Sequence, residues 1–246
     1  MVTMWKAIKI LIGILIIVIT LMIVMLSRSN AEFKSNFNYS AVMEAKSAVV
    51  IISTIGTLPS GYLSRAYKSI GFSIGDGYIV ALSHANDLKK MFPGAIYTKA
   101  THFVRDDKLE LIGRHEDISL FKSEMVRHSI PFGDSDQLKY GTYVVIVGFS
   151  RTRMINIKDG IVSIPVIKDE FDAFTSTKDF MKNTIMVTAP MNPGDSGSPV
   201  IAFRDDKPEV VGIAALMAIR RQGMNFMLKS NYVQKAIAEI KGGKVN

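Results

Sequence analysis

The sequence predicts an all-β domain, built as a sandwich or a barrel, behind one N-terminal transmembrane helix. Short apolar and β-branched runs recur along the chain with turn residues between them, and only one later stretch has helical spacing. Residues 10–26 form an apolar run without charge. With 48% hydrophobic and 21% charged residues in 246, the chain can bury a substantial core and is not of disordered composition.

The cysteine count and the charge limit the partners. The chain has no cysteine, which excludes disulfides and thiolate metal sites, and we expect neither a metal nor a cofactor. Its formal net charge of +8 favours anionic surfaces. Because the lysines and arginines are scattered and no nucleic-acid motif accompanies them, we expect a membrane and not a nucleic acid as the anionic partner.

Residues 1–31 are interpreted as a membrane anchor with its flank. The run over 10–26, extended by residues 7–9, reaches the ~20 residues that a helix needs to cross a bilayer. A cleaved signal peptide is the alternative, since Ser29 and Ala31 place small residues where a signal peptidase reads, although the run exceeds the ~7 to 15 residues usual for such a signal. Basic residues flank the run on both sides, so they do not decide its orientation.

Residues 32–246 are read as the β domain. A polar connector over 32–40 precedes the first β-branched run, and Gly75-Asp76-Gly77 between two apolar stretches is a hairpin signal. Residues 231–241 are the one predicted helix, which has apolar side chains at helical spacing and ends at Gly242. The predicted strands are 47–55, the two arms of 70–83, 95–99, 108–112, 118–122, 143–148, 160–167, 184–188, 199–202, 210–215 and 225–228.

Ser196 is the candidate nucleophile. It lies in the tight loop Gly194-Asp195-Ser196-Gly197, bounded by prolines and by apolar runs that would hold the loop rigidly. A serine hydroxyl is a weak nucleophile, so it needs a base and also backbone N–H donors aimed at the developing oxyanion. Glycine allows the backbone conformations that such donors require.

A base and an orienting acid are found upstream. Of the four histidines, His84 follows a hairpin strand directly, where it can face a cleft, whereas His102 lies at a similar strand end without a partner motif. His115 and His128 stand beside charged residues and are read as solvated loop histidines. Asp117, at the head of an apolar strand, is the candidate carboxylate that would orient the imidazole.

Three segments, residues 71–84, 116–122 and 191–200, together resemble the trypsin-like (chymotrypsin-fold) serine proteases, and within them most closely the HtrA-type bacterial branch. The order histidine, aspartate, serine is that of the family, and the resemblance covers nearly everything after the apolar run. It implies two six-stranded antiparallel β-barrels, the first over about 41–132 and the second over about 140–230, followed by the helix 231–241.

The resemblance also implies a serine endopeptidase with its triad between the barrels. Ser196 would attack a peptide carbonyl, His84 would take and return the proton, and Asp117 would orient His84. The N–H groups of Gly194 and Ser196 would form the oxyanion hole.

Specificity follows from the same resemblance. In this fold the floor of the primary pocket lies six residues before the nucleophile, which here is Pro190, so no acid is present to receive a basic side chain. Ala214, Ala215, Leu216 and Phe226 would edge an apolar pocket, and we expect cleavage after small or aliphatic residues.

Asp195 and Ser198 depart from the HtrA pattern. HtrA-type enzymes mostly carry asparagine before the nucleophile, whereas in the animal trypsins an aspartate there pairs with a new N-terminus freed by cleavage. Asp195 must therefore be solvated, paired with a nearby base, or left to destabilise the loop. Ser198 replaces the usual glycine, and no PDZ domain is expected after the final helix. HtrA-like regulation and trimerisation therefore do not carry over from the resemblance, and the oligomeric state stays open.

The expected partners are a protein or peptide substrate and, through the N-terminal helix, a membrane, with the protease domain outside the cytoplasm. One alternative is a membrane-tethered protein of the same fold that binds peptides or acts as a scaffold without cleaving them. An esterase with the same triad is disfavoured, because Gly194 to Gly197 lie between β-type runs and not on a strand-to-helix elbow.

Overall fold

The structure is a computed structural model that describes Trp5 and residues 13–22, 39–63, 67–91, 97–125, 127–149, 154–166, 181–217 and 224–243. The chain divides into two compact units, Met1–Phe37 and Asn38–Asn246. In the first unit, residues 13–22 are helical. None of the helices within the described ranges is long and apolar enough to cross a membrane. The predicted span over 10–26 lies partly outside these ranges.

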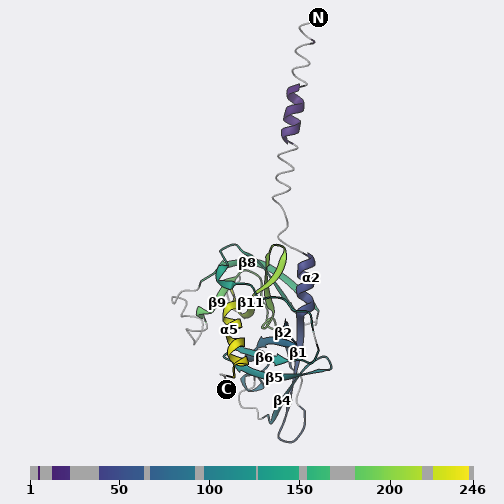
Figure 1. Cartoon of the computed structure of the whole chain (residues 1–246), viewed down its shortest axis with the longest axis vertical. Helices are drawn as coiled ribbons and strands as arrows, with labels where there is room; N and C mark the ends of the chain where they lie inside the picture. Colours follow the sequence, from purple (N-terminus) through teal and green to yellow (C-terminus); the bar gives the residue numbers. More distant parts are fainter. Residues whose placement is uncertain are drawn as a thin grey trace. The chain divides into compact units, whose positions relative to one another are not determined.

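Two closed β-barrels of six antiparallel strands each make up the second unit, which confirms the predicted all-β double barrel (Figure 1). The first barrel has the neighbour order β1-β2-β3-β6-β5-β4 and the second β10-β11-β12-β9-β8-β7. The strands of the first are β1 (Val49–Thr57), β2 (Tyr67–Gly75), β3 (Tyr78–Leu82), β4 (Lys99–Val104), β5 (Asp107–His115) and β6 (Ile118–Lys122). The strands of the second are β7 (Tyr143–Phe149), β8 (Ile155–Ile164), β9 (Thr184–Val187), β10 (Pro199–Arg204), β11 (Lys207–Met217) and β12 (Asn225–Lys229).

Hydrophobic clusters hold each barrel and join the two. Ile52, Ile79 and Phe121 belong to a cluster built from strands of the first barrel, and a second cluster is built from strands of the second barrel. The largest cluster takes residues from both barrels, among them Phe72 and Ile201. Burying each large apolar side chain contributes roughly 1.5–3 kcal/mol, so this shared core fixes one barrel on the other.

Two helices also contact both barrels. The predicted C-terminal helix is confirmed as α5 (Ser230–Lys241), which packs on β5 and β6 of the first barrel and on β11 and β12 of the second (Figure 1). Helix α2 (Tyr39–Ala48) contacts β2, β7 and β11. A short helix α3 (Leu88–Met91) and the 3-10 turns η1 (Ser83–Ala85) and η2 (Ser135–Gln137) complete the elements.

Helix α2 corrects the prediction of a polar connector followed by a strand from residue 47. Its buried face consists of Ala41, Val42, Ala45 and Ala48, which recur at helical spacing but are mostly small. Three alanines give a weak apolar signal in the sequence, while their small size lets the helix approach the sheet closely. The first strand therefore begins at Val49.

The strand predicted over 95–99 agrees with the structure only at its last residue, and residues 95 and 96 lie outside the described ranges. Tyr97 and Thr98 precede β4, which begins at Lys99 and pairs with β1 through Thr54 and His102. Polar and apolar residues do not alternate regularly along β4, so its pairing with β1 and not its hydrophobic pattern defines it. Strand β8 begins at Ile155, five residues before the predicted start at 160.

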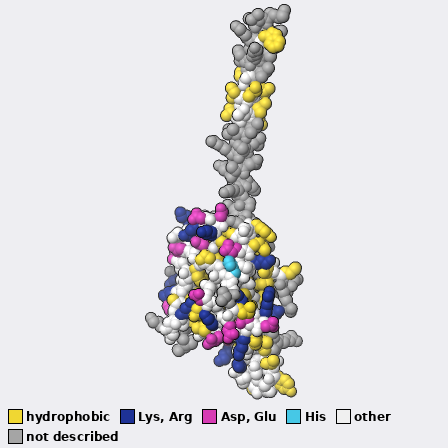
Figure 2. Space-filling view, turned by 45° about the vertical axis from the view of Figure 1, so that its right-hand side comes forward, with side chains coloured by type: hydrophobic (Ala, Val, Ile, Leu, Met, Phe, Trp, Pro, Cys, Tyr) yellow, Lys and Arg dark blue, Asp and Glu magenta, His cyan; other side chains and the backbone are white. Residues whose placement is uncertain are grey.

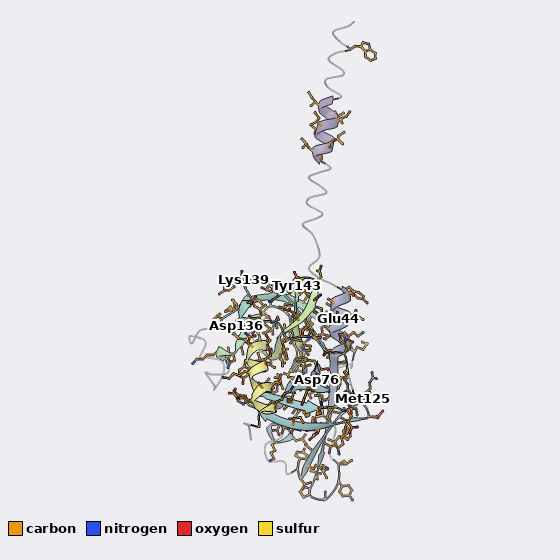
Figure 3. The ribbon with its side chains drawn as sticks, viewed as in Figure 1. Glu44, Asp76, Met125, Asp136, Lys139 and Tyr143 are labelled. Atoms are coloured by element: carbon orange, nitrogen blue, oxygen red, sulfur yellow. The ribbon has the colours of Figure 1, made fainter. Side chains whose placement is uncertain are left out.

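The surface of this unit carries charges of both signs. On the face that Figure 2 shows, basic and acidic side chains are interspersed and do not form a large patch of one sign. Lys139 and Tyr143 lie near each other at one end of the second barrel, whereas Asp76 and Met125 belong to the first (Figure 3).

Candidate active site

His84 and Asp117 are brought together by the pairing of β3 with β6. His84 lies in η1 directly after β3, and Asp117 lies in the turn directly before β6, while Leu82 pairs with Ile118. The backbone N–H of His84 donates to Asp117 Oδ1 at 2.9 Å, and His84 Nδ1 lies 2.6 Å from Asp117 Oδ2. Because a carboxylate only accepts, Nδ1 carries the proton in this hydrogen bond, and Nε2 is the ring nitrogen that does not contact Asp117.

A buried polar network beneath His84 was not predicted. Ser119 Oγ donates to Asn86 Oδ1 at 3.0 Å and lies 3.0 Å from Ser83 Oγ, while Asn86 Nδ2 donates to Leu82 O at 2.6 Å. All three polar side chains are buried. Buried polar groups that satisfy each other make a local structure rigid, so this network fixes the turn that carries His84. Its only sequence signal is polar residues inside apolar runs.

The turn that carries Asp117 is held by the C-terminal helix. Glu116 has a φ of 48°, a left-handed conformation that is costly for this residue. The hydroxyl of Tyr232 in α5 donates to Glu116 Oε2 at 2.5 Å. Burial and the Glu116 carboxylate raise the pKa of Tyr232, so its hydroxyl remains a donor.

Ser196 lies in the loop between β9 and β10, here called the Ser196 loop (residues 191–198). Gly194 and Gly197 have φ values of 105° and 95°. A Cβ at Gly197 would lie 2.1 Å from Ile70 O, so the loop needs glycine there both for its backbone and for its contact with the first barrel.

The backbone donors of the Ser196 loop divide into two groups. The N–H groups of Asp195, Gly197 and Ser198 donate to backbone oxygens at 3.0, 2.9 and 2.9 Å. Those of Gly194 and Ser196 have no acceptor among the described residues. The two amides predicted to bind an oxyanion are therefore the ones without an internal acceptor.

One cavity of about 270 Å³ contains both halves of the site. Its walls include His84 next to the first barrel and Ser196 from the second. Within the described part of the chain, no hydrogen bond joins these two side chains. Such bonds are commonly long in proteins without substrate and shorten when substrate binds.

The cavity wall differs from the predicted substrate pocket. Ala214, Ala215 and Leu216 line it, as expected. Pro190 is exposed and Phe226 packs in a separate hydrophobic cluster, and neither is part of the lining. The remaining lining residues are Met191, Asn192, Pro193, Asp195 and Met217.

The other histidines lie elsewhere. His102 is buried inside β4 and not at a strand end, with Nδ1 2.9 Å from Thr54 Oγ1, and burial followed by the charge of Arg114 lowers its pKa to about 4. His115 is the last residue of β5, 3.3 Å from Glu239, and His128 lies 3.5 Å from Glu44. Among the described residues, no group of histidine, aspartate and glutamate side chains could hold a metal ion.

Asp195 is buried and paired. It is 3% exposed, and its Oδ2 receives both the ammonium of Lys158 on β8 and the N–H of Asn192, the latter at 2.5 Å. Of the three states that the sequence allowed for this carboxylate, the structure has the one in which a nearby base neutralises it. Lys158 was not predicted.

A family model matches the part of the chain that carries this site. Residues 72–213, more than half of the chain, match the trypsin-like peptidase domain, and the chain belongs to this family. Its relatives include a "Serine protease HtrA-like" from two strains of Staphylococcus epidermidis, 26% identical over 196 residues, which are 73% of this chain and 31% of the relative. A "Serine protease Do-like HtrB" from Bacillus subtilis is 29% identical over 130 residues, 49% of this chain and 26% of the relative.

These matches confirm the resemblance to trypsin-like proteases of the HtrA type. The chain spans about a third or less of the length of these curated relatives.

Proposed function

We propose that the chain is a serine endopeptidase that hydrolyses peptide bonds through an acyl-enzyme on Ser196. The observation that carries this proposal is that His84, joined to Asp117 at 2.6 Å, lies on the wall of the same cavity as Ser196. Membership of the trypsin-like peptidase family supports the same reaction class.

The chemistry assigns one step to each side chain. His84 Nε2 accepts the proton of Ser196 while Ser196 Oγ bonds to the substrate carbonyl carbon. The imidazolium then returns that proton to the leaving amine as the carbon–nitrogen bond breaks. A water molecule, deprotonated by His84, hydrolyses the resulting ester and restores Ser196. Asp117 keeps the imidazole in its tautomer and stabilises the charged form.

The backbone supplies the electrostatic part. The uncommitted N–H groups of Gly194 and Ser196 would donate to the oxyanion of the tetrahedral intermediate. Removing one such donor typically reduces kcat by 10²–10³. Gly194 has a positive φ, a backbone conformation that glycine adopts without the cost that a Cβ would add.

The cavity favours apolar substrate side chains. Met191, Ala214, Ala215, Leu216 and Met217 make up half of its lining, and its one acid, Asp195, is already paired with Lys158. We therefore propose cleavage after small or aliphatic residues. A peptide library cleaved mainly after lysine or arginine would contradict this specificity.

Reaction with a fluorophosphonate probe tests the proposal. The wild type should label and should hydrolyse an unfolded protein such as casein, and Ser196→Ala should lose both activities while keeping the melting temperature. Ser60→Ala, which changes an exposed serine, is the matched control and should label fully. A folded wild type that binds peptides and never labels would instead indicate the non-cleaving binding module.

We further propose that an N-terminal helix tethers this domain to a membrane, with the protease domain outside the cytoplasm. The uncharged run over residues 10–26 supports this proposal. Alkaline carbonate extraction of membranes should leave the full-length chain in the pellet, and N-terminal sequencing should begin at Met1. A mature chain that begins after Ala31 and extracts freely would indicate a cleaved signal peptide.

A further inference from the structure

Asp195 is a buried carboxylate to which the catalytic mechanism assigns no role. Its side chain is 4% exposed, so an unpaired negative charge there would cost several kcal/mol. The Lys158 ammonium, on a side chain that is 10% exposed, contacts the same oxygen that accepts the Asn192 N–H. The cation that neutralises Asp195 thus comes from the middle of the chain itself.

The pairing of β7 with β8 places Lys158 at this position. Gly148 pairs with Asn156 and Ile146 pairs with Lys158, and because strand side chains alternate, Asn156 and Lys158 lie on one face of β8. Opposite them, a Cβ on Gly148 would stand 2.8 Å from Ser198 Oγ and 3.1 Å from Asp195 Oδ1. The glycine on β7 therefore leaves the room that the carboxylate occupies.

Asp195 in turn connects the two turns of the Ser196 loop. Its N–H donates to Asn192 O at 3.0 Å and its Oδ2 accepts the Asn192 N–H, which closes the first turn. Its carbonyl accepts the N–H of Ser198 at 2.9 Å, which closes the second. Gly194 and Ser196, whose amides have no internal acceptor, directly flank this residue. The direction in which their N–H groups point is therefore linked to where the Asp195 side chain is held.

We propose that Lys158 is a positioning residue for the reaction: by holding Asp195, it keeps the Gly194 and Ser196 N–H groups directed at the substrate carbonyl oxygen. This inference rests on the proposed function. It has a regulatory consequence, because a carboxylate already neutralised by an internal lysine needs neither a freed amino terminus nor a partner's cation. The oxyanion hole would then form without a cation from outside the domain.

Lys158→Met tests this role, because methionine keeps the length of the side chain and removes the charge. Peptide hydrolysis should fall by about 10²–10³ in kcat, the loss expected when an oxyanion donor is misplaced, with KM changed less than threefold. Adding Asp195→Asn to Lys158→Met removes the unpaired charge. The kcat of this double variant should be about tenfold higher than that of Lys158→Met. Lys207→Met, which removes an exposed charge from the same barrel, should match the wild type.

Inhibitor affinity separates positioning from folding. A peptide boronic acid forms a tetrahedral adduct that needs the oxyanion hole, whereas the corresponding product peptide does not. Lys158→Met should bind the boronic acid about 10²-fold more weakly and the product peptide nearly as well as the wild type. If folded Lys158→Met binds the boronic acid like the wild type, Lys158 only stabilises the fold and the inference is wrong. If Lys158→Met fails to fold, the double variant Lys158→Met with Asp195→Asn is compared with the wild type instead. Equal boronic acid affinity and equal kcat in these two proteins would overturn the inference.

The proposed function and this inference fail in distinguishable ways. If the folded wild type never labels with a fluorophosphonate, the proposed function fails. The amide NMR signals of Gly194 and Ser196 then carry the test, and Lys158→Met should shift both signals and accelerate their hydrogen exchange. Unchanged signals would show that Lys158 does not position the loop.

Discussion

Each barrel contributes one carboxylate paired with a nitrogen base, and the two pairs differ in burial. In the His84–Asp117 pair the side chains are 43% and 19% exposed, whereas in the Lys158–Asp195 pair they are 10% and 4% exposed. An imidazole that reaches the cavity can exchange a proton with a substrate. A buried ammonium held by a carboxylate keeps its position and does not take part in proton transfer. We therefore propose that the exposed His84 serves proton transfer and that the buried Lys158–Asp195 pair serves positioning.

Both pairs are internal to their own half of the domain. His84 and Asp117 follow β3 and precede β6 of the first barrel, and Lys158 and Asp195 come from β8 and the loop before β10 of the second. The two halves meet through the hydrophobic cluster shared by the barrels and through α5. Changes at one pair should therefore leave the other pair intact.

The largest expected effect on kcat is at the His84–Asp117 pair. Asp117→Asn should reduce kcat by about 10⁴, because an amide at this position can donate to Nδ1 and so favours the wrong imidazole tautomer. The melting temperature should change by only a few degrees, since neither side chain of the pair is fully buried. Steady-state hydrolysis and calorimetry measure the two quantities. Asp205→Asn, on an exposed turn, is the control; full activity in Asp117→Asn would remove this aspartate from the mechanism.

At the buried pair we expect a cost in stability in addition to the loss of kcat. Lys158→Met leaves a buried carboxylate without its cation, and removing one partner of a buried pair typically costs about 3–5 kcal/mol. Glu44→Gln, which breaks the exposed contact with His128 on the same domain, should cost about 1 kcal/mol or less. Urea unfolding followed by fluorescence measures both. Equal costs for the two variants would contradict the buried assignment of Lys158 and Asp195.

The pH dependence of stability should report His102. Its pKa is lowered to about 4, so between about pH 6.5 and pH 4 the unfolded chain binds a proton that the folded chain does not. The free energy of unfolding should therefore fall as the pH drops through this range, by at most about 3 kcal/mol. His102→Asn, which keeps an acceptor for Thr54, should lose this component of the slope. His128→Asn, at an exposed site, should keep it.

A smaller effect is expected at the contact between α5 and the Asp117 turn. Tyr232→Phe removes the hydroxyl that donates to Glu116, a hydrogen bond to a charged group, and should cost about 1.5 kcal/mol at most. Because the turn carries Asp117, kcat should fall a few-fold while KM stays the same. Tyr140→Phe removes an exposed hydroxyl and serves as control. A larger loss than for Asp117→Asn would mean that Tyr232 acts on the substrate directly.

The sequence predicted those site residues that lie in short motifs, and it missed those whose partners are distant in the chain. Ser196, His84 and Asp117 each lie in a short motif at a strand end or tight turn, and the structure brings all three to one site. Lys158 has no such motif, since its partner depends on the register between β7 and β8. The buried Ser83, Asn86 and Ser119 network likewise becomes visible only when β3 and β6 are paired.

The fold shows the same division. Most strands follow from alternating apolar runs, and the double barrel followed from the family motifs. Helix α2 was missed because its buried face is mostly alanine, and most of β4 because its polar and apolar residues do not alternate regularly. Pro190 was assigned to the pocket by counting back from Ser196, whereas Met191 lines the cavity. Which of these neighbouring residues lines the cavity depends on the conformation of the loop, which counting positions along the sequence does not give.

The structure of the protein with a bound peptide boronic acid tests the account most directly. We expect a covalent bond from Ser196 Oγ to boron and one boronate oxygen about 2.7–3.1 Å from the N–H nitrogens of both Gly194 and Ser196. Lys158 should remain on Asp195 in the same crystal. An inhibitor that is not bonded to Ser196, or a boronate oxygen turned away from the two amides while Lys158 still holds Asp195, would contradict the account.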